Sequence, residues 1–570
     1  MTTPDPGSSS NVARRLAHFA AERPDAYAVV VQRHRLWGRK ARYETASFAE
    51  LESRSSRIAR GLRRWGVADG ARLALLVKPS VEFVTLVFAL LKAGVVMTLI
   101  DPGMGRKNML RCLAESEPEG FVAIPAAQAV RRMFRSRFPR AKWNVTVGPR
   151  RLWDGLTLAE LEALAVAPAE TPAADSFPNC APKSAGDPAA IIFTTGSTGP
   201  PKGVLYQHGN FDRQVDEIRA GFAIAPGEVN LACFPLFGLF NAAMGVTTIV
   251  PDMDASRPAR VNPAYIVEAV ADWRATQSFA SPAVWHRVGE YCARTGARMP
   301  TLREAYSAGA PVPPPVIERT VAAMSAGGRL HTPYGATEAL PVATIASPEI
   351  LEDTRFGYAQ GKGTCVGRRF PGIEWRVVRI YDGPLAKIDD AEPAPLGEIG
   401  ELIVRGPVVT ERYVTRVEAN AAAKIADGDG VWHRMGDAGY LDGQDRFWFC
   451  GRVGHRVRTA EGTLYTDPVE GIFNQHPAVY RSALVGVGKP KRQTPVLIVE
   501  LKPAARDMAR NAAVERELLQ LAADHETTAA IKTVLFHRSL PVDIRHNSKI
   551  FREQLAVWAA RKLKVDAAAS

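Results

Sequence analysis

The chain has 570 residues, long for one domain, and its 46% hydrophobic content is enough for large buried cores. Charged residues make up 23%, close to the globular average, which argues against an intrinsically disordered chain. The net charge of +13 favours anionic ligands, membrane surfaces or acidic partners. Nucleic acid is not an expected partner, because the sequence has no zinc-finger spacing, RNA-binding aromatic signature or long Lys/Arg tract.

The six cysteines are widely separated, and none forms a Cys-x-x-Cys pair. This spacing predicts neither a disulfide framework nor a cysteine-based metal site, and it favours a reducing cytoplasm. The polar N-terminal sequence MTTPDPGSSSNVARR is unlike a signal peptide. The longest apolar run, residues 83–100, contains Lys92 and Gly94. It is therefore predicted to be a buried helix, a turn and a strand rather than a membrane span.

Helix-like and strand-like segments alternate in the first part of the chain. A helical pattern over residues 48–66 ends at a glycine, and a strand is expected at 71–77. A helix at 81–94 and a strand at 95–102 follow. This alternation predicts an α/β architecture with a parallel sheet.

Three further regions follow along the chain. The Pro/Ala-rich stretch at 164–188 is predicted to be an exposed loop. The alternation then resumes to about Arg379, and the segment 396–409 opens a smaller β-rich unit. Strands at 482–488 and 495–501 and a helix at 511–525 predict a compact α/β unit at the end. No internal repeat is present.

The stretch TTGSTGPPKG, residues 194–203, follows the apolar strand-like residues 189–193. Glycines let backbone N–H groups approach a ligand closely, while hydroxyls and a lysine add hydrogen-bond donors and charge. A loop of this kind after a strand predicts a phosphate-binding loop. It is not a Walker loop, which needs four residues between its first glycine and Gly-Lys-[Ser/Thr]. A flexible surface loop is the alternative.

Five more motifs follow in order: SAGAPV (307–312), YGATEA (334–339), WHRMGDAGY (432–440), GRVGHRVR (451–458) and PVDIRHNSKIFRE (541–553). Together with the glycine-rich loop, their order and spacing resemble the adenylate-forming superfamily, which includes acyl-CoA synthetases, luciferase-like enzymes and peptide-synthetase adenylation domains. The resemblance covers nearly the whole chain. It implies an α/β fold with a large N-terminal domain of two α/β subdomains plus a β-rich one, residues 1–452. A hinge at 453–454 and a small mobile α+β C-terminal domain, 455–570, would follow.

The resemblance implies ATP and Mg²⁺ as cofactors and an acyl-adenylate as the intermediate. The loop over the β- and γ-phosphates would contain Thr194, Thr195, Gly196, Ser197, Thr198, Gly199 and Lys202. Gly309, Ala310 and Pro311 would lie along the adenine, and Tyr334 would stack on it. Asp437 would accept hydrogen bonds from the ribose hydroxyls, with Arg452 nearby.

Three residues would act on the reacting groups. Thr337 would contact phosphate, and Glu338 would hold Mg²⁺ through one oxygen. Lys549 would bridge the substrate carboxylate and the α-phosphate as negative charge develops. Taken singly, four of the candidate site residues also fit plainer roles: a surface carboxylate for Glu338, a solvated lysine for Lys549, a turn cap for Asp437 and a core residue for Tyr334.

The sequence departs from the family pattern at several positions. In FPLFGLFN (234–241), Gly238 stands where acyl-CoA synthetases often have histidine, which predicts room for a bulky acid in a pocket that also includes Phe237 and Gly335. Gly454 occupies the hinge position, and Glu461 lies where a glycine would line a pantetheine tunnel. Asn547 alters the usual context of the catalytic lysine. An altered tunnel and a roomy pocket disfavour thioester formation.

Three segments look most similar in sequence to the β-lactone synthetases of bacterial long-chain olefin biosynthesis: residues 194–211, FPLFGLFN and RHNSKIFRE. That resemblance implies a long-chain 2-alkyl-3-hydroxy acid whose own hydroxyl attacks the acyl-adenylate, giving a β-lactone, AMP and pyrophosphate. It is compatible with assembly with other olefin-pathway enzymes and with peripheral membrane contact. His455 is a candidate base for the hydroxyl, although a surface histidine is the plainer interpretation.

Three alternatives to the β-lactone synthetase remain open from the sequence. A long-chain fatty acyl-CoA synthetase would share the first step and use coenzyme A as acceptor. An acyl-AMP ligase would load a separate carrier protein. A non-catalytic acyl or nucleotide binder is disfavoured, because it would not need Glu338, Asp437 and Lys549 together.

Overall fold

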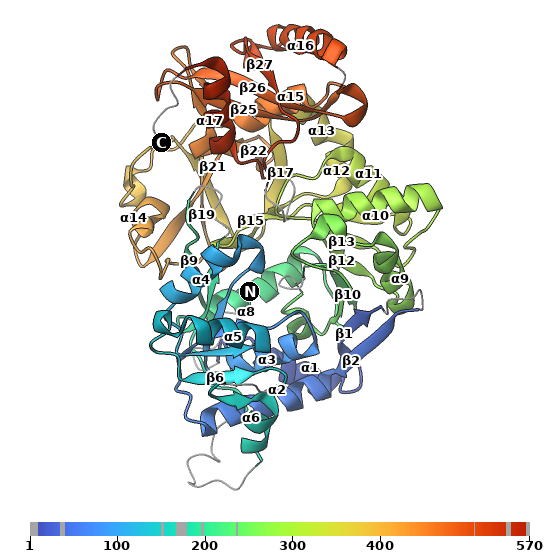
Figure 1. Cartoon of the computed structure of the whole chain (residues 1–570), viewed down its shortest axis with the longest axis vertical. Helices are drawn as coiled ribbons and strands as arrows, with labels where there is room; N and C mark the ends of the chain where they lie inside the picture. Colours follow the sequence, from blue (N-terminus) through green and yellow to red (C-terminus); the bar gives the residue numbers. More distant parts are fainter. Residues whose placement is uncertain are drawn as a thin grey trace.

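The computed structural model describes residues 9–34, 40–149, 153–166, 179–194, 199–234, 238–506, 508–542 and 549–565 (Figure 1). Within these residues, two seven-stranded sheets and one eight-stranded sheet precede a two-stranded and a three-stranded sheet near the C-terminal end. In Figure 1 the C-terminal elements, orange to red, lie at one end of the molecule, next to the eight-stranded sheet. The α/β elements, blue to green, lie at the other end.

The first seven-stranded sheet has the strand order β7-β6-β5-β3-β4-β8-β9. All its pairs are parallel except β8–β9. Its strands are β3 (Arg72–Leu76), β4 (Val96–Leu99), β5 (Gly120–Ala123), β6 (Trp143–Thr146), β7 (Leu156–Thr157), β8 (Pro188–Phe193) and β9 (Gly203–Gln207). Its helices are α2 (Phe48–Arg64), α3 (Val81–Lys92), α4 (Arg106–Glu115), α5 (Pro125–Met133) and α6 (Leu158–Leu164). The expected alternation of helices and strands is confirmed.

The apolar run at 83–100 forms most of α3, a turn at Gly94 and then β4. Residues of α3 belong to a hydrophobic cluster that also includes residues from strands of both seven-stranded sheets. Burial on nearly every side explains why nine of the twelve residues of this helix are apolar. Its buried Lys92 ammonium is paired with Glu52 at 2.6 Å. None of the described helices combines the length and hydropathy needed to cross a bilayer.

The second seven-stranded sheet has the order β14-β13-β12-β10-β11-β1-β2, and only β1–β2 is antiparallel. Its strands are β1 (Tyr27–Arg33), β2 (Arg42–Ser47), β10 (Val229–Ala232), β11 (Thr247–Val250), β12 (Gln277–Phe279), β13 (Glu304–Tyr306) and β14 (Arg329–His331). The accompanying helices are α1 (Arg14–Glu22), α8 (His208–Gly221), α9 (Pro263–Trp273), α10 (Pro282–Thr295) and α11 (Pro314–Ala323).

The expected β-rich unit is an antiparallel sheet, but its expected start at residues 396–409 is wrong, because four of its strands precede residue 379. Its strands are β15 (Tyr334–Ala336), β16 (Ala339–Thr344), β17 (Thr364–Arg369), β18 (Glu374–Val378), β19 (Gly400–Arg405), β20 (Lys424–Asp427), β21 (Gly430–Leu441) and β22 (Arg446–Arg452). The short helices α12 (Ser347–Glu349), α13 (Arg355–Ala359) and α14 (Ala419–Ala423) lie between them in sequence. Two predicted motifs, YGATEA and WHRMGDAGY, therefore belong to one sheet.

The C-terminal part has its own hydrophobic clusters. It contains β23 (Val457–Arg458), β24 (Thr463–Leu464), β25 (Val479–Val487), β26 (Thr494–Leu501), β27 (Val534–Phe536), α15 (Thr466–Phe473), α16 (Met508–Ala523) and α17 (Arg552–Leu563). The helix α15 contacts α13 and β22, and the Thr364 hydroxyl donates to Asp467 Oδ2 at 2.7 Å.

All six cysteines are free.

Candidate active site

The predicted phosphate loop joins β8 to β9. Its two ends are tied together, since Thr194 N donates to the Lys202 carbonyl at 3.0 Å and Lys202 N donates to Thr194 Oγ1 at 3.1 Å. Gly199 is exposed in the described part of the loop. Thr195, Gly196, Ser197 and Thr198 lie outside the described residues. The base of the loop is therefore a closed hairpin at the edge of the first sheet.

Hydrogen bonds to distant segments hold this hairpin. Gly203 N donates to Thr415 Oγ1 at 2.7 Å, and Leu205 N donates to the Arg412 carbonyl at 3.1 Å. The Tyr206 hydroxyl donates to the Thr337 carbonyl at 2.6 Å, across 131 positions of sequence. These contacts bring the predicted phosphate loop next to the Thr337–Glu338 turn between β15 and β16.

Glu338 is held in place by two residues that precede β20. The Tyr413 hydroxyl donates to Glu338 Oε1 at 2.6 Å, and Thr410 Oγ1 donates to the Glu338 carbonyl at 3.0 Å. No described residue hydrogen-bonds Glu338 Oε2. The Lys202 ammonium lies 4.8 Å from the centroid of the Tyr413 ring. The carboxylate that was predicted to hold a cation and the predicted phosphate lysine thus share one tyrosine neighbour.

Asp437, Arg452 and Tyr334 form a second cluster. Asp437 and Arg452 are partners across β21 and β22, and Arg452 Nη1 lies 2.6 Å from Asp437 Oδ1. The Tyr334 hydroxyl donates to Asp437 Oδ2 at 2.5 Å. Burial and the neighbouring carboxylate both raise the pKa of Tyr334. Because each carboxylate oxygen has two acceptor sites, Asp437 could still accept hydrogen bonds from two ribose hydroxyls.

Two glycine-containing motifs lie in turns. Gly309, with φ +94°, lies with Ala310 and Pro311 in the loop between β13 and α11. Gly309 and Pro311 are exposed, and Ala310 is half-buried. A Cβ at Gly335 would come within 2.6 Å of the Ala339 carbonyl oxygen, so the tight β15–β16 turn requires a glycine.

Gly238 does not border open space on the side where a Cβ would project. A Cβ there would lie 2.8 Å from Ala232 Cβ and 3.2 Å from Thr248 Cγ2. Close packing therefore supplies a structural reason for this glycine, distinct from the expected room for a bulky acid. Phe237, its predicted partner in the pocket, lies outside the described residues. The acyl pocket itself stays a prediction.

Lys549 precedes α17 in the C-terminal part, beside a β-bridge between Val542 and Ile550. It is half-buried. Gly454 is exposed in the short helical turn Val453–His455 that follows β22, and no atom would lie within 4 Å of a Cβ added to it. Glu461 is exposed in the turn before β24. The hinge and tunnel roles of these two residues stay predictions.

The plainer interpretation of His455 as a surface histidine is wrong. Its side chain is only 8% exposed, and its Nε2 lies 3.1 Å from Glu553 Oε1 at the start of α17. This contact lowers the pKa of Glu553. The ring is thus engaged with a carboxylate of the C-terminal part, and no described contact links it to the two clusters above.

A sequence model described as AMP-binding enzyme matches residues 16–414. The chain belongs to the AMP-binding enzyme family. It is 45% identical over 97% of its length to an olefin beta-lactone synthetase of Xanthomonas campestris pv. campestris, 98% of which is covered. It is 44% identical over 97% of its length to a protein of the same name from Stenotrophomonas maltophilia, 99% of which is covered. This family member is accordingly an ATP-dependent, AMP-forming enzyme.

Solved structures confirm the expected fold of the family member. The amide bond synthetase McbA from Marinactinospora thermotolerans aligns over 96% of this chain and 99% of its own, with a TM-score of 0.76 and 22% identity. ATP-bound MatB from Rhodopseudomonas palustris aligns over 97% of this chain and 99% of its own, with a TM-score of 0.74 and 20% identity. At these identities the likeness concerns the fold alone.

The Glu338 carboxylate would suit a magnesium ion that arrives with the nucleotide. Mg²⁺ prefers oxygen ligands and is commonly bound by one or two carboxylates plus substrate phosphates. Glu338 offers such a carboxylate oxygen beside the predicted phosphate loop. Within the described ranges, no group of three or more His, Cys, Asp or Glu side chains is arranged to hold a metal by itself.

Sequence reasoning missed several residues that contact the candidate site. Tyr206, Thr410, Tyr413 and Lys424 all contact predicted site residues or their immediate neighbours. Tyr206 belongs to the quoted stretch 194–211, but the other three carry no motif signal. Their contacts arise where β9, β16 and the segment before β20 meet.

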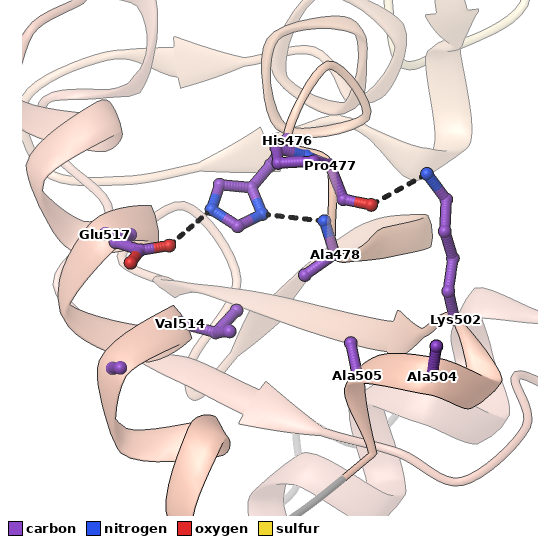
Figure 2. Close-up of a pocket in the computed structure, with 9 residues that line it drawn as sticks. His476, Pro477, Ala478, Lys502, Ala504, Ala505, Val514 and Glu517 are labelled. Carbon is purple, nitrogen blue, oxygen red and sulfur yellow. Dashed lines mark hydrogen bonds and ion pairs between the residues drawn. The ribbon is translucent and has the colours of Figure 1, made fainter.

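Two hollows lie away from the predicted site residues. A groove of about 980 Å³ lies beyond the carboxyl ends of β3, β5 and β6 and is lined by α2 and α6. A smaller hollow in the C-terminal part lies beside His476, whose ring contacts Glu517 and the Ala478 amide (Figure 2). Because these polar groups are already paired with each other, the smaller hollow has no evident ligand chemistry.

Proposed function

We propose that this enzyme activates a long-chain 2-alkyl-3-hydroxy acid as an acyl-adenylate and then closes it to a β-lactone, releasing pyrophosphate and AMP. The observation that carries the proposal is the 45% and 44% identity, over nearly the full chain, to two olefin beta-lactone synthetases. The clusters around Glu338 and Asp437 support the nucleotide half of the reaction.

In the first step, a carboxylate oxygen of the acid attacks the α-phosphorus of ATP. The bond between that phosphorus and the bridging oxygen to the β-phosphate breaks, and its electron pair leaves with pyrophosphate. Lys202 and the hairpin loop would hold the terminal phosphates, while Asp437 would orient the ribose. When bound, Mg²⁺ would neutralise part of the phosphate charge beside Glu338. Lys549 would stabilise charge at the α-phosphate.

In the second step, the 3-hydroxyl oxygen attacks the acyl carbon, the hydroxyl proton is released and the bond to AMP breaks. Because the nucleophile is tethered to the electrophile, no external acceptor has to be captured. The mixed anhydride is reactive enough to close a strained four-membered ring.

The domain division also belongs to the proposal. We place the boundary after Arg452, where the eight-stranded sheet ends, with residues 453–454 as the hinge and 455–570 as the mobile domain. Directly after it, Arg458 Nη1 donates to Asp382 Oδ2 at 2.7 Å and Arg456 bonds the same carboxylate. Rotation of the C-terminal domain about the hinge would break these contacts. It would place Lys549 at the reacting groups for the first step and withdraw it for the second.

A coenzyme A ligase is the second candidate, because a feruloyl-CoA synthase of Amycolatopsis is 28% identical over 78% of this chain. Mass spectrometry of products formed from ATP, Mg²⁺ and a long-chain 2-alkyl-3-hydroxy acid separates the two. A product one water lighter than the acid, formed without coenzyme A and shown to be cyclic by NMR, supports the lactone. A thioester formed only with coenzyme A contradicts it.

The proposal also includes a cytoplasmic location. It includes assembly with enzymes that make the hydroxy acid or consume the lactone, and peripheral contact with a membrane. For membrane contact, the relevant surface is α5 and the turn after it. Val130 and Met133 are 41% and 75% exposed there, beside the exposed Arg132, Arg135 and Arg137. Exposed apolar and cationic side chains together suit an anionic lipid surface. Flotation with anionic vesicles, with neutral vesicles as the control, tests this contact.

A further inference from the structure

Lys424 begins β20 and lies close to the phosphate half of the nucleotide site. It is half-buried and is the cross-strand partner of His433 on β21. Its ammonium donates to the Thr410 carbonyl and lies 5.9 Å from the centroid of the Tyr413 ring. No motif in the sequence assigned a role to this lysine.

The two neighbours of Lys424 are the residues that hold Glu338. Thr410 donates to the Glu338 carbonyl through both its N–H, at 2.9 Å, and its hydroxyl, at 3.0 Å. Tyr413 donates to the Glu338 carboxylate at 2.6 Å. A side chain that fixes Thr410 and contacts Tyr413 therefore acts on the position of Glu338 from two directions.

Lys424 also adds charge at this place. Lys202, from the phosphate loop, lies 4.8 Å from the same Tyr413 ring. Burial lowers the pKa of Lys424 to about 8, with Lys202 acting in the same direction and Glu338 and Glu411 opposing it. Because both ammonium groups lie near the Tyr413 ring and repel each other, a bound anion would relieve this repulsion, and the arrangement suits the terminal phosphates of ATP.

We propose that Lys424 is a positioning residue for the triphosphate: it fixes Thr410 and Tyr413, and through them Glu338, and it adds a second positive charge beside Lys202 for the β- and γ-phosphates. This inference rests on the nucleotide site of the proposed function, not on the identity of the acid. It predicts that Lys424 distinguishes ATP from AMP, because AMP lacks these two phosphates.

Calorimetric titration of Lys424→Met with ATP and with AMP, both with Mg²⁺ and without the acid, tests this role. We expect ATP affinity to fall about tenfold or more, the usual size of a lost charge-assisted contact. AMP affinity should stay within about twofold of the unmutated enzyme. Lys424→Arg should retain most ATP affinity, because it keeps the charge. Lys362→Met, at an exposed lysine of the same β-rich unit, is the matched control and should change neither affinity.

Steady-state kinetics give a second readout, in which the KM for ATP should rise more than kcat falls. Equal losses of ATP and AMP affinity in a folded variant would overturn the role of Lys424, as would an unchanged ATP affinity. Should Lys424→Met fail to fold, Lys424→Gln provides the same comparison, because it retains a donor for the Thr410 carbonyl without the charge. An unmutated enzyme that binds neither nucleotide would instead contradict the proposed nucleotide site itself.

Discussion

Asp437 and Arg452 face each other on β21 and β22, and Arg452 Nη1 lies 2.6 Å from Asp437 Oδ1. Arg452 also donates to the Met435 carbonyl at 3.0 Å, and Tyr334 donates to the other oxygen of Asp437. The nearby carboxylate raises the pKa of Arg452. The buried carboxylate is therefore fixed before any ligand arrives, as an acceptor for a ribose should be.

Asp437→Asn should weaken the binding of ATP and AMP to the same extent, because both nucleotides carry the ribose. Loss of the charged acceptor predicts a fall of about tenfold or more in each affinity, measured by calorimetric titration. Asp445→Asn, at a more exposed aspartate after β21 that pairs with Arg369, is the control. Unchanged AMP affinity in Asp437→Asn would contradict the ribose role.

Glu338→Gln should raise the Mg²⁺ concentration needed for half-maximal adenylate formation, because an amide oxygen is a poorer ligand for a hard cation than a carboxylate oxygen. The measurement is pyrophosphate release across a Mg²⁺ titration at fixed ATP. Glu411→Gln removes a nearby carboxylate that bonds Gln207, and it should leave the Mg²⁺ dependence unchanged. An identical dependence in Glu338→Gln and the unmutated enzyme would remove Glu338 from the metal site.

Lys549→Ala should lower the rate of adenylate formation by about a hundredfold or more, because the developing charge at the α-phosphate loses its cation. Exchange of labelled pyrophosphate into ATP, in the presence of the acid, reports this step alone. Lys562→Ala, at an exposed lysine of α17, is the matched control. If exchange continues at the normal rate in folded Lys549→Ala, the lysine is not the adenylation residue.

Gly238→Ala should destabilise the protein by about 1–3 kcal/mol, because its Cβ would overlap an already packed neighbour. The distance to Ala232 Cβ would be 2.8 Å. Thermal unfolding measures the change, with Gly443→Ala as the control because no atom lies within 4 Å of a Cβ at that exposed turn. Unchanged thermal stability of Gly238→Ala would show that the site has room, as the expectation of an enlarged acyl pocket requires.

The contact between the C-terminal part and the β-rich sheet should weaken as the pH rises. Burial raises the pKa of Asp467 from its ordinary value of 3.8 to about 7, and Glu470 acts in the same direction. Because the folded protein binds this proton more tightly than the unfolded chain, the protonated Asp467 carboxyl contributes to folding stability below pH 3.8. This contribution is lost as the pH rises through about 7. Limited proteolysis between pH 5 and 8 should show this loss. Asp467→Asn should flatten the profile, and an unchanged profile would rule out Asp467 as its cause.

The sequence by itself determined the order of elements and the identity of the motif residues. Periodicity located α2, because the spacing of its apolar side chains reflects which face of the helix is buried, whereas a continuous apolar run located α3, which is buried on nearly every side. The glycine-rich loop after β8 was equally visible, because its composition follows from local backbone geometry. The aspartate of WHRMGDAGY and the arginine of GRVGHRVR were also named, although nothing local showed that they form an ion pair.

Only the tertiary structure decided which residues support those motifs. Tyr206 reaches Thr337 across 131 positions, and Tyr413 reaches Glu338 across 75, so neither pairing leaves a periodic or motif signal. The side chain of His455 is only 8% exposed and contacts Glu553 of α17, although its neighbours in sequence are those of a surface segment. Gly238 is required by Ala232 and Thr248, which pack beside it. A motif reflects the local backbone geometry and chemistry of one segment, whereas these contacts depend on how the sheets pack together.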